Sequence, residues 1–177
     1  MRETLKQVAA VMRDAEIPFV LGGGFAAWAN GAPPSDHDLD LMLKPEDAGR
    51  ALDALAESGF KTEKPPEEWL YKAWDGDILV DLIFRPQGYE IDDDVIERSP
   101  FENVESVRMR VMSPSDLLVS KLLALREHEV DYDSVLEVAR SLREQIDWDD
   151  VRARTEHSPY AKAFFTLVSE LEIAPVA

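Results

Sequence analysis

Apolar residues recur at helical spacing near the start of the chain and again after the first proline-containing loop. Leu5, Val8 and Met12 lie on one face of a 3.6-residue period, which predicts an amphipathic helix over residues 2–15. The same spacing after Pro45 predicts a second helix that stops near Ser58-Gly59. These two segments are expected to cover a sheet with their apolar faces.

Short apolar or alternating runs between and after these helices predict strands. The run "IPFVLGGG" predicts a short buried strand that ends at the glycines, and "FAAWAN" a short helix closed by Asn30-Gly31. The run "DLDLML" alternates as a strand with one buried face does. "WLYKAW" and "DILVDLIF" predict a hairpin about Asp75-Gly76.

The pattern changes to helices alone after residue 112. "EIDDDVIERS" fits neither a helix nor a strand clearly, and "VESVRMRVM" predicts one strand with an irregular alternation that suggests a bulge. Ser113 and Pro114 then form a helix start, with the helix running through Leu125, and further helices fill residues 131–171. We therefore expect a mixed α and β core over residues 1–112 and a helical region over residues 113–177.

Composition narrows the functional classes. The 177 residues contain 45% apolar residues and no cysteine, so a real core is expected and disulfides and thiolate metal sites are excluded. No run approaches the roughly 20 apolar residues that span a bilayer, and the N-terminus has no signal-peptide pattern. These features predict a soluble cytoplasmic protein without a membrane partner.

The net charge of −17 is concentrated in the middle of the chain. Residues 1–30 and residues 151–177 each carry three basic and three acidic side chains, so the whole excess lies in residues 31–150. A general nucleic-acid binder would show a basic face, because neutralising phosphates supplies most of its affinity. Any nucleic-acid contact of this chain must therefore be local.

Three aspartates are candidates for a metal site. Asp38 and Asp40 are two residues apart on a predicted strand and share one face, while Leu39 points to the other face. Two carboxylates this close repel each other unless a cation lies between them, and magnesium prefers such oxygen ligands. Asp81 interrupts an apolar strand, and it can complete the cluster if that strand lies beside the first.

The glycines ahead of these aspartates suit an anion. A strand that ends in Gly22-Gly23-Gly24 and opens a helix allows backbone N–H groups to approach a phosphate closely. Ser35 and Asp36 could also contact a triphosphate, although ordinary turn chemistry explains them equally. Together with the aspartates, these residues indicate two-metal phosphoryl or nucleotidyl transfer.

This combination resembles a known superfamily. Gly23-Gly24, thirteen intervening residues and the sequence Asp38-Leu39-Asp40-Leu41 are similar to the signature of the DNA polymerase beta-like nucleotidyltransferases, and Asp81 stands at the place of their third catalytic carboxylate. The resemblance implies an α+β fold, in which helices flank a small mixed, mostly antiparallel sheet. It also implies an NTP substrate and two Mg²⁺ ions at Asp38, Asp40 and Asp81.

The helical region resembles a particular branch of that superfamily. The stretch that begins "SPSDLLVSK" is similar to the bacterial toxin-type enzymes, the AbiE- and MenT-like proteins, in which a lysine at the place of Lys121 contacts the nucleotide. The resemblance implies transfer to RNA, for example to the tRNA 3′ end, and an antitoxin protein as a partner. The stretch from "GGGFA" to "HDLDL" is also similar to small aminoglycoside nucleotidyltransferases.

The residues leave other functions open. The acidic charge favours a small acceptor such as an antibiotic hydroxyl over RNA. A nucleotide-binding or partner-binding module without turnover, and an interaction domain that binds no nucleotide, are the remaining alternatives. Asp38, Asp40, Asp81 and Lys121 are the expected catalytic residues, and the nucleotide choice and oligomeric state are not specified by any motif.

Overall fold

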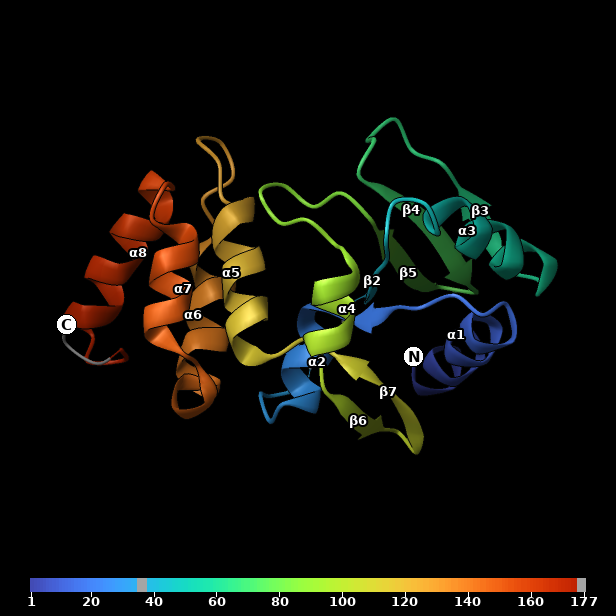
Figure 1. Cartoon of the computed structure of the whole chain (residues 1–177), viewed down its shortest axis with the longest axis horizontal. Coiled ribbons are helices and arrows are strands. Elements are labelled where there is room, and N and C mark those ends of the chain that lie inside the picture. Colours follow the sequence, from blue (N-terminus) through green and yellow to red (C-terminus); the bar gives the residue numbers. More distant parts are fainter. Residues whose placement is uncertain (35–37, 175–177) are drawn as a thin grey trace.

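A seven-stranded mixed sheet organises the chain (Figure 1). The computed structural model describes residues 1–34 and 38–174. The strand order is β3-β4-β5-β2-β1-β7-β6, in which the pairs β1–β7 and β2–β5 are parallel and the other four pairs are antiparallel. The strands are β1 (Val20–Leu21), β2 (Leu39–Met42), β3 (Lys61–Glu63), β4 (Leu70–Asp75), β5 (Ile78–Ile83), β6 (Phe101–Val104) and β7 (Val107–Val111).

Helices lie on both faces of this sheet and at one end of the molecule (Figure 1). They are α1 (Arg2–Asp14), α2 (Gly23–Ala29), α3 (Ala48–Glu57), α4 (Asp93–Arg98), α5 (Pro114–Ala124), α6 (Tyr132–Ser141), α7 (Trp148–Thr155) and α8 (Pro159–Glu170). Helix α3 packs on β3, β4 and β5, and α1 packs on α3 and β7. The predicted fold class, a mostly antiparallel sheet flanked by helices with a helical C-terminal part, is confirmed.

The core explains why the central strands are apolar on one face. Leu39 and Leu41 of β2 are fully buried, as are Val80 and Leu82, their direct partners on β5. Because side chains alternate along a strand, this burial fixes which face the intervening polar residues occupy. Residues of every helix and of the central strands join one continuous hydrophobic cluster.

One predicted strand is interrupted by a turn, and two segments were not assigned. Residues 104–112 were expected to form a single strand, but β6 and β7 form a hairpin whose turn residues, Glu105 and Ser106, have φ of 49° and 68°. Positive φ is uncommon outside glycine, so no residue type at these two positions indicates a turn. The exposed edge strand β3 has no apolar alternation, and the ambiguous acidic segment forms α4, with Asp92 as its N-cap.

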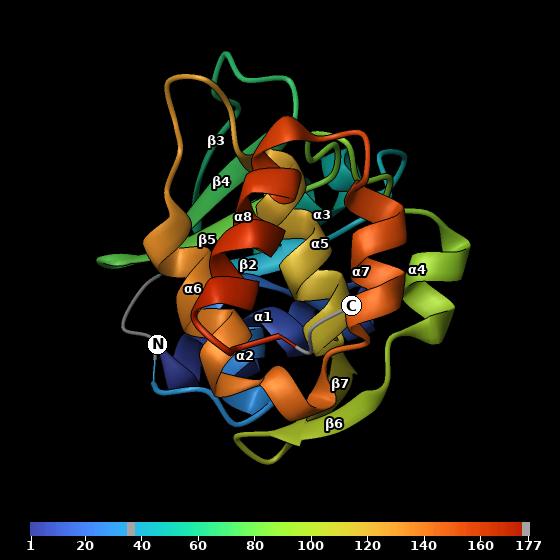
Figure 2. The same cartoon turned by 90° about the vertical axis from the view of Figure 1, so that its left-hand side faces the viewer.

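The helical region begins as its capping residues indicate. The Ser113 hydroxyl accepts a hydrogen bond from the Asp116 N–H at 3.1 Å, and Pro114 is the first residue of α5. Helix α5 packs against α2, α6, α7 and α8. Helices α5 to α8 gather at the left in Figure 1, on the side that faces the viewer in Figure 2. The division into a core and a separate helical region at residue 112 stays a prediction. Among the described residues, no helix combines the length and apolar character needed to span a bilayer.

A buried carboxylate, Asp116, ties the helical region to the rest of the chain. It accepts hydrogen bonds from Tyr89 at 2.8 Å, from Arg98 of α4 at 2.9 Å and from Arg154 of α7 at 2.7 Å. Burial alone would raise the pKa of Asp116, but the hydrogen bonds from the two arginines and the tyrosine outweigh it and lower this pKa from 3.8 to about 2. Four separate segments therefore meet at one ionised group.

Removing this charge should destabilise the fold. We expect Asp116→Asn to lower the free energy of unfolding at pH 7 by about 3 kcal/mol, because two arginines lose their partner in a buried site. The native pKa lies below the unfolded one, so this contribution is present above about pH 4 and lost as the pH falls towards 2. Urea unfolding at pH 7 and pH 3 measures both effects.

Asp150 provides the matched control for this prediction. It also accepts a hydrogen bond from Arg154, at 2.9 Å, but its side chain is 43% exposed. Asp150→Asn should cost less than about 1 kcal/mol, as half-exposed pairs do. Equal losses in the two variants would contradict the special role of Asp116.

Candidate active site

Asp40 and Asp81 lie side by side on neighbouring parallel strands. Asp40 of β2 is in direct register with Asp81 of β5, so their side chains share the face of the sheet opposite to Leu39 and Leu41. Neither aspartate is exposed: both residues are partly buried. The strand of Asp81 therefore lies beside the strand of Asp40, which is the arrangement that a shared carboxylate site requires.

Asp38 lies just before β2 and is exposed. Its charge acts on both other aspartates, since it contributes to raising the pKa of Asp40 and of Asp81. Within residues 1–34 and 38–174, however, no three histidine, aspartate or glutamate side chains converge closely enough to form a ready cation site. Asp40 and Asp81 are thus brought together by the sheet, and Asp38 lies at the margin of the pair.

The electrostatics of the pair is unfavourable without a cation. Burial, followed by the neighbouring charge of Asp81, raises the pKa of Asp40 from 3.8 to about 7. Burial also raises the pKa of Asp81, against the opposing effect of Lys72. The Oδ1 atom of Asp81 is buried and has no hydrogen-bond partner among the described residues. A divalent cation would satisfy that oxygen and relieve the repulsion, so the donor set fits a magnesium ion.

Glycine is required where α2 begins beside Asp40. The Gly22 N–H donates to the Asp40 carbonyl oxygen at 2.8 Å, which fixes the end of β1 against β2. Gly23 follows with φ of 57°, and a Cβ atom there would overlap the Asp40 carboxylate. The first turn of α2 and the candidate metal ligands are therefore in direct contact.

A cleft joins these groups to the helical region. Its volume is about 440 Å³, and Gly23, Gly24 and Asp40 form one wall. Lys121 of α5 also lines the cleft, and its charge lowers the pKa of Asp40. The glycine turn, a carboxylate and the lysine that the sequence singled out thus line one space. The predicted contacts of Ser35 and Asp36 lie outside the described residues.

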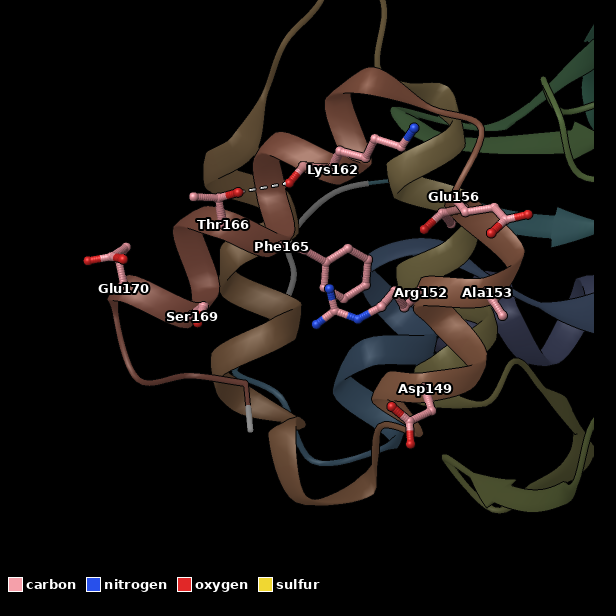
Figure 3. A pocket seen from close by; sticks show the side chains of 10 residues that line it. Asp149, Arg152, Ala153, Glu156, Lys162, Phe165, Thr166, Ser169 and Glu170 are labelled. Carbon is pink, nitrogen blue, oxygen red and sulfur yellow. Dashed lines mark hydrogen bonds between the residues drawn. The ribbon is translucent and has the colours of Figure 1, made fainter. Parts of the chain in front are cut away.

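A hollow larger than this cleft lies elsewhere on the molecule. It has a volume of about 660 Å³ and is formed between α7 and α8, where the Arg152 guanidinium lies 4.3 Å from the centre of the Phe165 ring (Figure 3). Lys162, Asp149 and Glu156 also line it. None of the predicted site residues belongs to this groove, so its size carries no information about the carboxylates.

Two groups of site residues were not anticipated. Helix α6 contributes Ser134, Glu137 and Val138 to the cleft, and no motif marks them. Lys72 of β4 is in direct register with Asp81, and its Nζ lies 3.4 Å from the Asp81 Oδ1. The pairing of Lys72 with Asp81 follows from the predicted hairpin. A turn that pairs residues 75 and 78 also pairs residues 72 and 81.

Comparison with protein families gives a match over nearly the whole chain. A model of the family described as "Uncharacterised nucleotidyltransferase" matches residues 1–169. No functionally curated protein matches the chain at a significant level.

Solved structures share the architecture at low sequence identity. The crystal structure of ANT(2'')-Ia in complex with adenylyl-2''-tobramycin has a TM-score of 0.59 at 16% identity and covers 93% of this chain and 97% of its own. The solution structure of ANT(2'')-Ia gives 0.61 at 17% identity, covering 97% and 94%. The lincomycin-bound lincosamide antibiotic adenylyltransferase LnuA gives 0.54 at 13% identity, covering 78% and 96%. At such identities the likeness establishes a shared fold.

Proposed function

Because this chain belongs to the family described as uncharacterised nucleotidyltransferases, we propose that it transfers a nucleoside monophosphate from an NTP to an acceptor hydroxyl. The observation that carries this proposal is the direct register of Asp40 and Asp81 on neighbouring strands, together with the cleft that Asp40 lines beside Gly23 and Gly24. The cytoplasm, where NTPs are abundant, is the proposed location of the reaction.

The aspartates are the proposed metal ligands. Asp38, Asp40 and Asp81 would hold two Mg²⁺ ions, which when bound supply the positive charge that stabilises the phosphoryl group under attack. The buried Oδ1 of Asp81, which has no hydrogen bond, and the raised pKa of Asp40 support this assignment. Asp81 serves either as the third ligand or as the base that accepts the proton of the acceptor hydroxyl.

The remaining walls of the cleft are the proposed nucleotide site. The backbone of Gly22, Gly23 and Gly24 approaches the triphosphate at the start of α2, where no side chain separates it from Asp40. Lys121 binds the phosphates from α5 with its ammonium group. Ser35 and Asp36 remain proposed triphosphate contacts on sequence grounds alone.

For the acceptor, we propose an RNA such as the tRNA 3′ end, with an antitoxin protein as a partner, on the resemblance of the α5 sequence to toxin-type enzymes. A small cationic molecule is the second candidate. The net charge of −17 and a cleft volume in the range of small-molecule sites favour it. A catalytically silent nucleotide-binding module is the third reading.

A transfer assay separates these acceptors. The protein is incubated with Mg²⁺ and labelled NTPs, together with total tRNA or with a panel of aminoglycosides and lincosamides. We expect label on tRNA, and a loss of at least about a hundredfold in Asp81→Asn, because the variant loses a carboxylate that serves as metal ligand or as base. Asp77→Asn, at an exposed position just before β5, is the matched control and should keep the activity.

Other results would count against parts of this proposal. Label on a small molecule and not on tRNA would replace the RNA acceptor with the second candidate. Label on neither, with NTP binding seen by calorimetry, would replace transfer with nucleotide binding.

A further inference from the structure

An ion pair inside the β4–β5 hairpin involves one of the proposed metal ligands. The Lys72 Nζ lies 3.4 Å from the Asp81 Oδ1, with 29% and 15% of the two side chains exposed. At 3.4 Å this contact is longer than the about 2.7–2.9 Å of a well-formed charged hydrogen bond. The ammonium group therefore approaches Asp81 as a charge and is not locked in place by directed bonds.

Cross-strand register places this lysine in a row of charged side chains. Glu63 of β3, Lys72 of β4, Asp81 of β5 and Asp40 of β2 are successive partners across four strands, so all four share one face. Lys72 is the positively charged member of this row, and its charge opposes the rise in pKa of both aspartates. It neutralises part of the repulsion between Asp81 and Asp40.

A divalent cation that binds Asp81 through its buried oxygen competes for the atom that faces the lysine. The Oδ1 of Asp81 is a buried acceptor without a hydrogen bond, and it is also the atom 3.4 Å from the ammonium group. A lysine ammonium is a single, well-hydrated charge on a flexible stem, and a partly exposed ion pair is weak. Such a pair can open when a stronger ligand for the carboxylate arrives.

We propose that Lys72 is a built-in competitor for the divalent cation at Asp81, so that cation binding requires the Lys72–Asp81 pair to open. The inference rests on the proposed function only in taking Asp81 as a metal ligand. Lys72 acts through Asp81, as a positioning residue that sets the cation concentration at which the site fills.

Cation binding without NTP tests this directly. EDTA-treated full-length protein is titrated with Mg²⁺ or Mn²⁺, and binding is followed by the shift in melting temperature and by calorimetry. We expect Lys72→Met to lower the cation concentration at half-saturation by about fivefold, the effect of removing a weak competing ion pair. Lys72→Arg, which keeps the charge, should stay close to the original protein.

Lys61 supplies the matched control. It lies on β3, and its ammonium is 5.2 Å from the centre of the Trp74 ring, with no carboxylate ion pair recorded among the described residues. Lys61→Met removes the same charge from the same face of the sheet. Because Lys61 lies over Trp74 and is not the ion-pair partner of Asp81, this change should leave the half-saturation concentration unchanged. If Lys72→Met does not fold, Lys72→Gln carries the same expectation with a polar side chain.

Three results would overturn the inference. An unchanged or higher half-saturation concentration in the Lys72 variants excludes competition. An equal shift in Lys61→Met attributes the effect to net charge. Absence of cation binding in every variant removes the metal site itself, and the transfer assay with Asp81→Asn then decides independently whether the proposed activity survives.

Discussion

Replacing Asp40 with asparagine should abolish nucleotidyl transfer and at the same time raise the melting temperature at pH 8. The activity should fall by about a thousandfold, because the variant loses a proposed cation ligand and bound metal supplies several kcal/mol of charge stabilisation. The stability gain follows from the pKa of Asp40, which burial and the charge of Asp81 raise from 3.8 to about 7. Asparagine removes a charge that the fold disfavours.

The sign of this effect depends on pH. Between about pH 4 and pH 7 the folded chain keeps a proton on Asp40 that the unfolded chain releases, so the free energy of unfolding falls as the pH rises through this window. In EDTA, Asp40→Asn should therefore melt about 5 °C above the original protein at pH 8 and close to it at pH 5. Thermal melts followed by circular dichroism at the two pH values measure the difference.

An exposed aspartate provides the comparison. Asp53 lies on the solvent side of α3, and Asp53→Asn should change neither the activity nor the pH dependence of the melting temperature. A melting temperature of Asp40→Asn that is lower at pH 8 than that of the original protein would mean that the Asp40 charge stabilises the fold, contrary to this account.

Gly23→Ala should have the second largest effect, on stability and activity together. The residue has φ of 57°, and the added Cβ would overlap the Asp40 carboxylate. Strain at this φ costs about 1 kcal/mol and the displacement of β2 or α2 costs more, so we expect a total loss of about 3 kcal/mol. Transfer activity should be lost even at temperatures where the variant is folded, because the clash lies at the cation ligands. Urea unfolding and the transfer assay measure the two effects.

Two other glycines separate the contributions. Gly76 has nearly the same φ, 58°, but a Cβ there meets nothing within 4 Å, so Gly76→Ala should show the backbone strain alone. Gly49 lies inside α3 with open space around it, and Gly49→Ala should stabilise the chain by about 0.5–1 kcal/mol. If Gly23→Ala behaves like Gly76→Ala, the contact with Asp40 is unimportant.

The parts of the site that could be predicted depend on local spacing. The alternation of Asp38, Leu39 and Asp40 predicted that the two carboxylates share one face of a strand. The apolar neighbours of Asp81 indicated a carboxylate at a position where burial is costly. The hairpin about Gly76 was also evident, and counting outwards from its turn pairs Lys72 with Asp81. The register of the hairpin alone therefore predicts that Lys72 lies beside Asp81.

The parts that could not be predicted depend on contacts between distant segments. The α6 residues that line the cleft follow from how α5 and α6 pack, which no local pattern specifies. Asp116 lies in the first turn of α5, and its bonds to Arg98, Arg154 and Tyr89 join segments 18, 38 and 27 residues away. The β6–β7 turn was missed because its residues adopt positive φ without glycine.

Asp40 lies between two fully buried leucines, so the alternation of inward and outward side chains along β2 limits which sequence changes the strand tolerates. Insertion or deletion of one residue within β2 would send Asp40 into the apolar layer and bring leucines to the cleft, because each step along a strand exchanges its two sides. Among related sequences, the number of residues in this strand should therefore vary less than the identity of its apolar residues. Changes of chain length are compatible with the chemistry only where they leave that alternation intact.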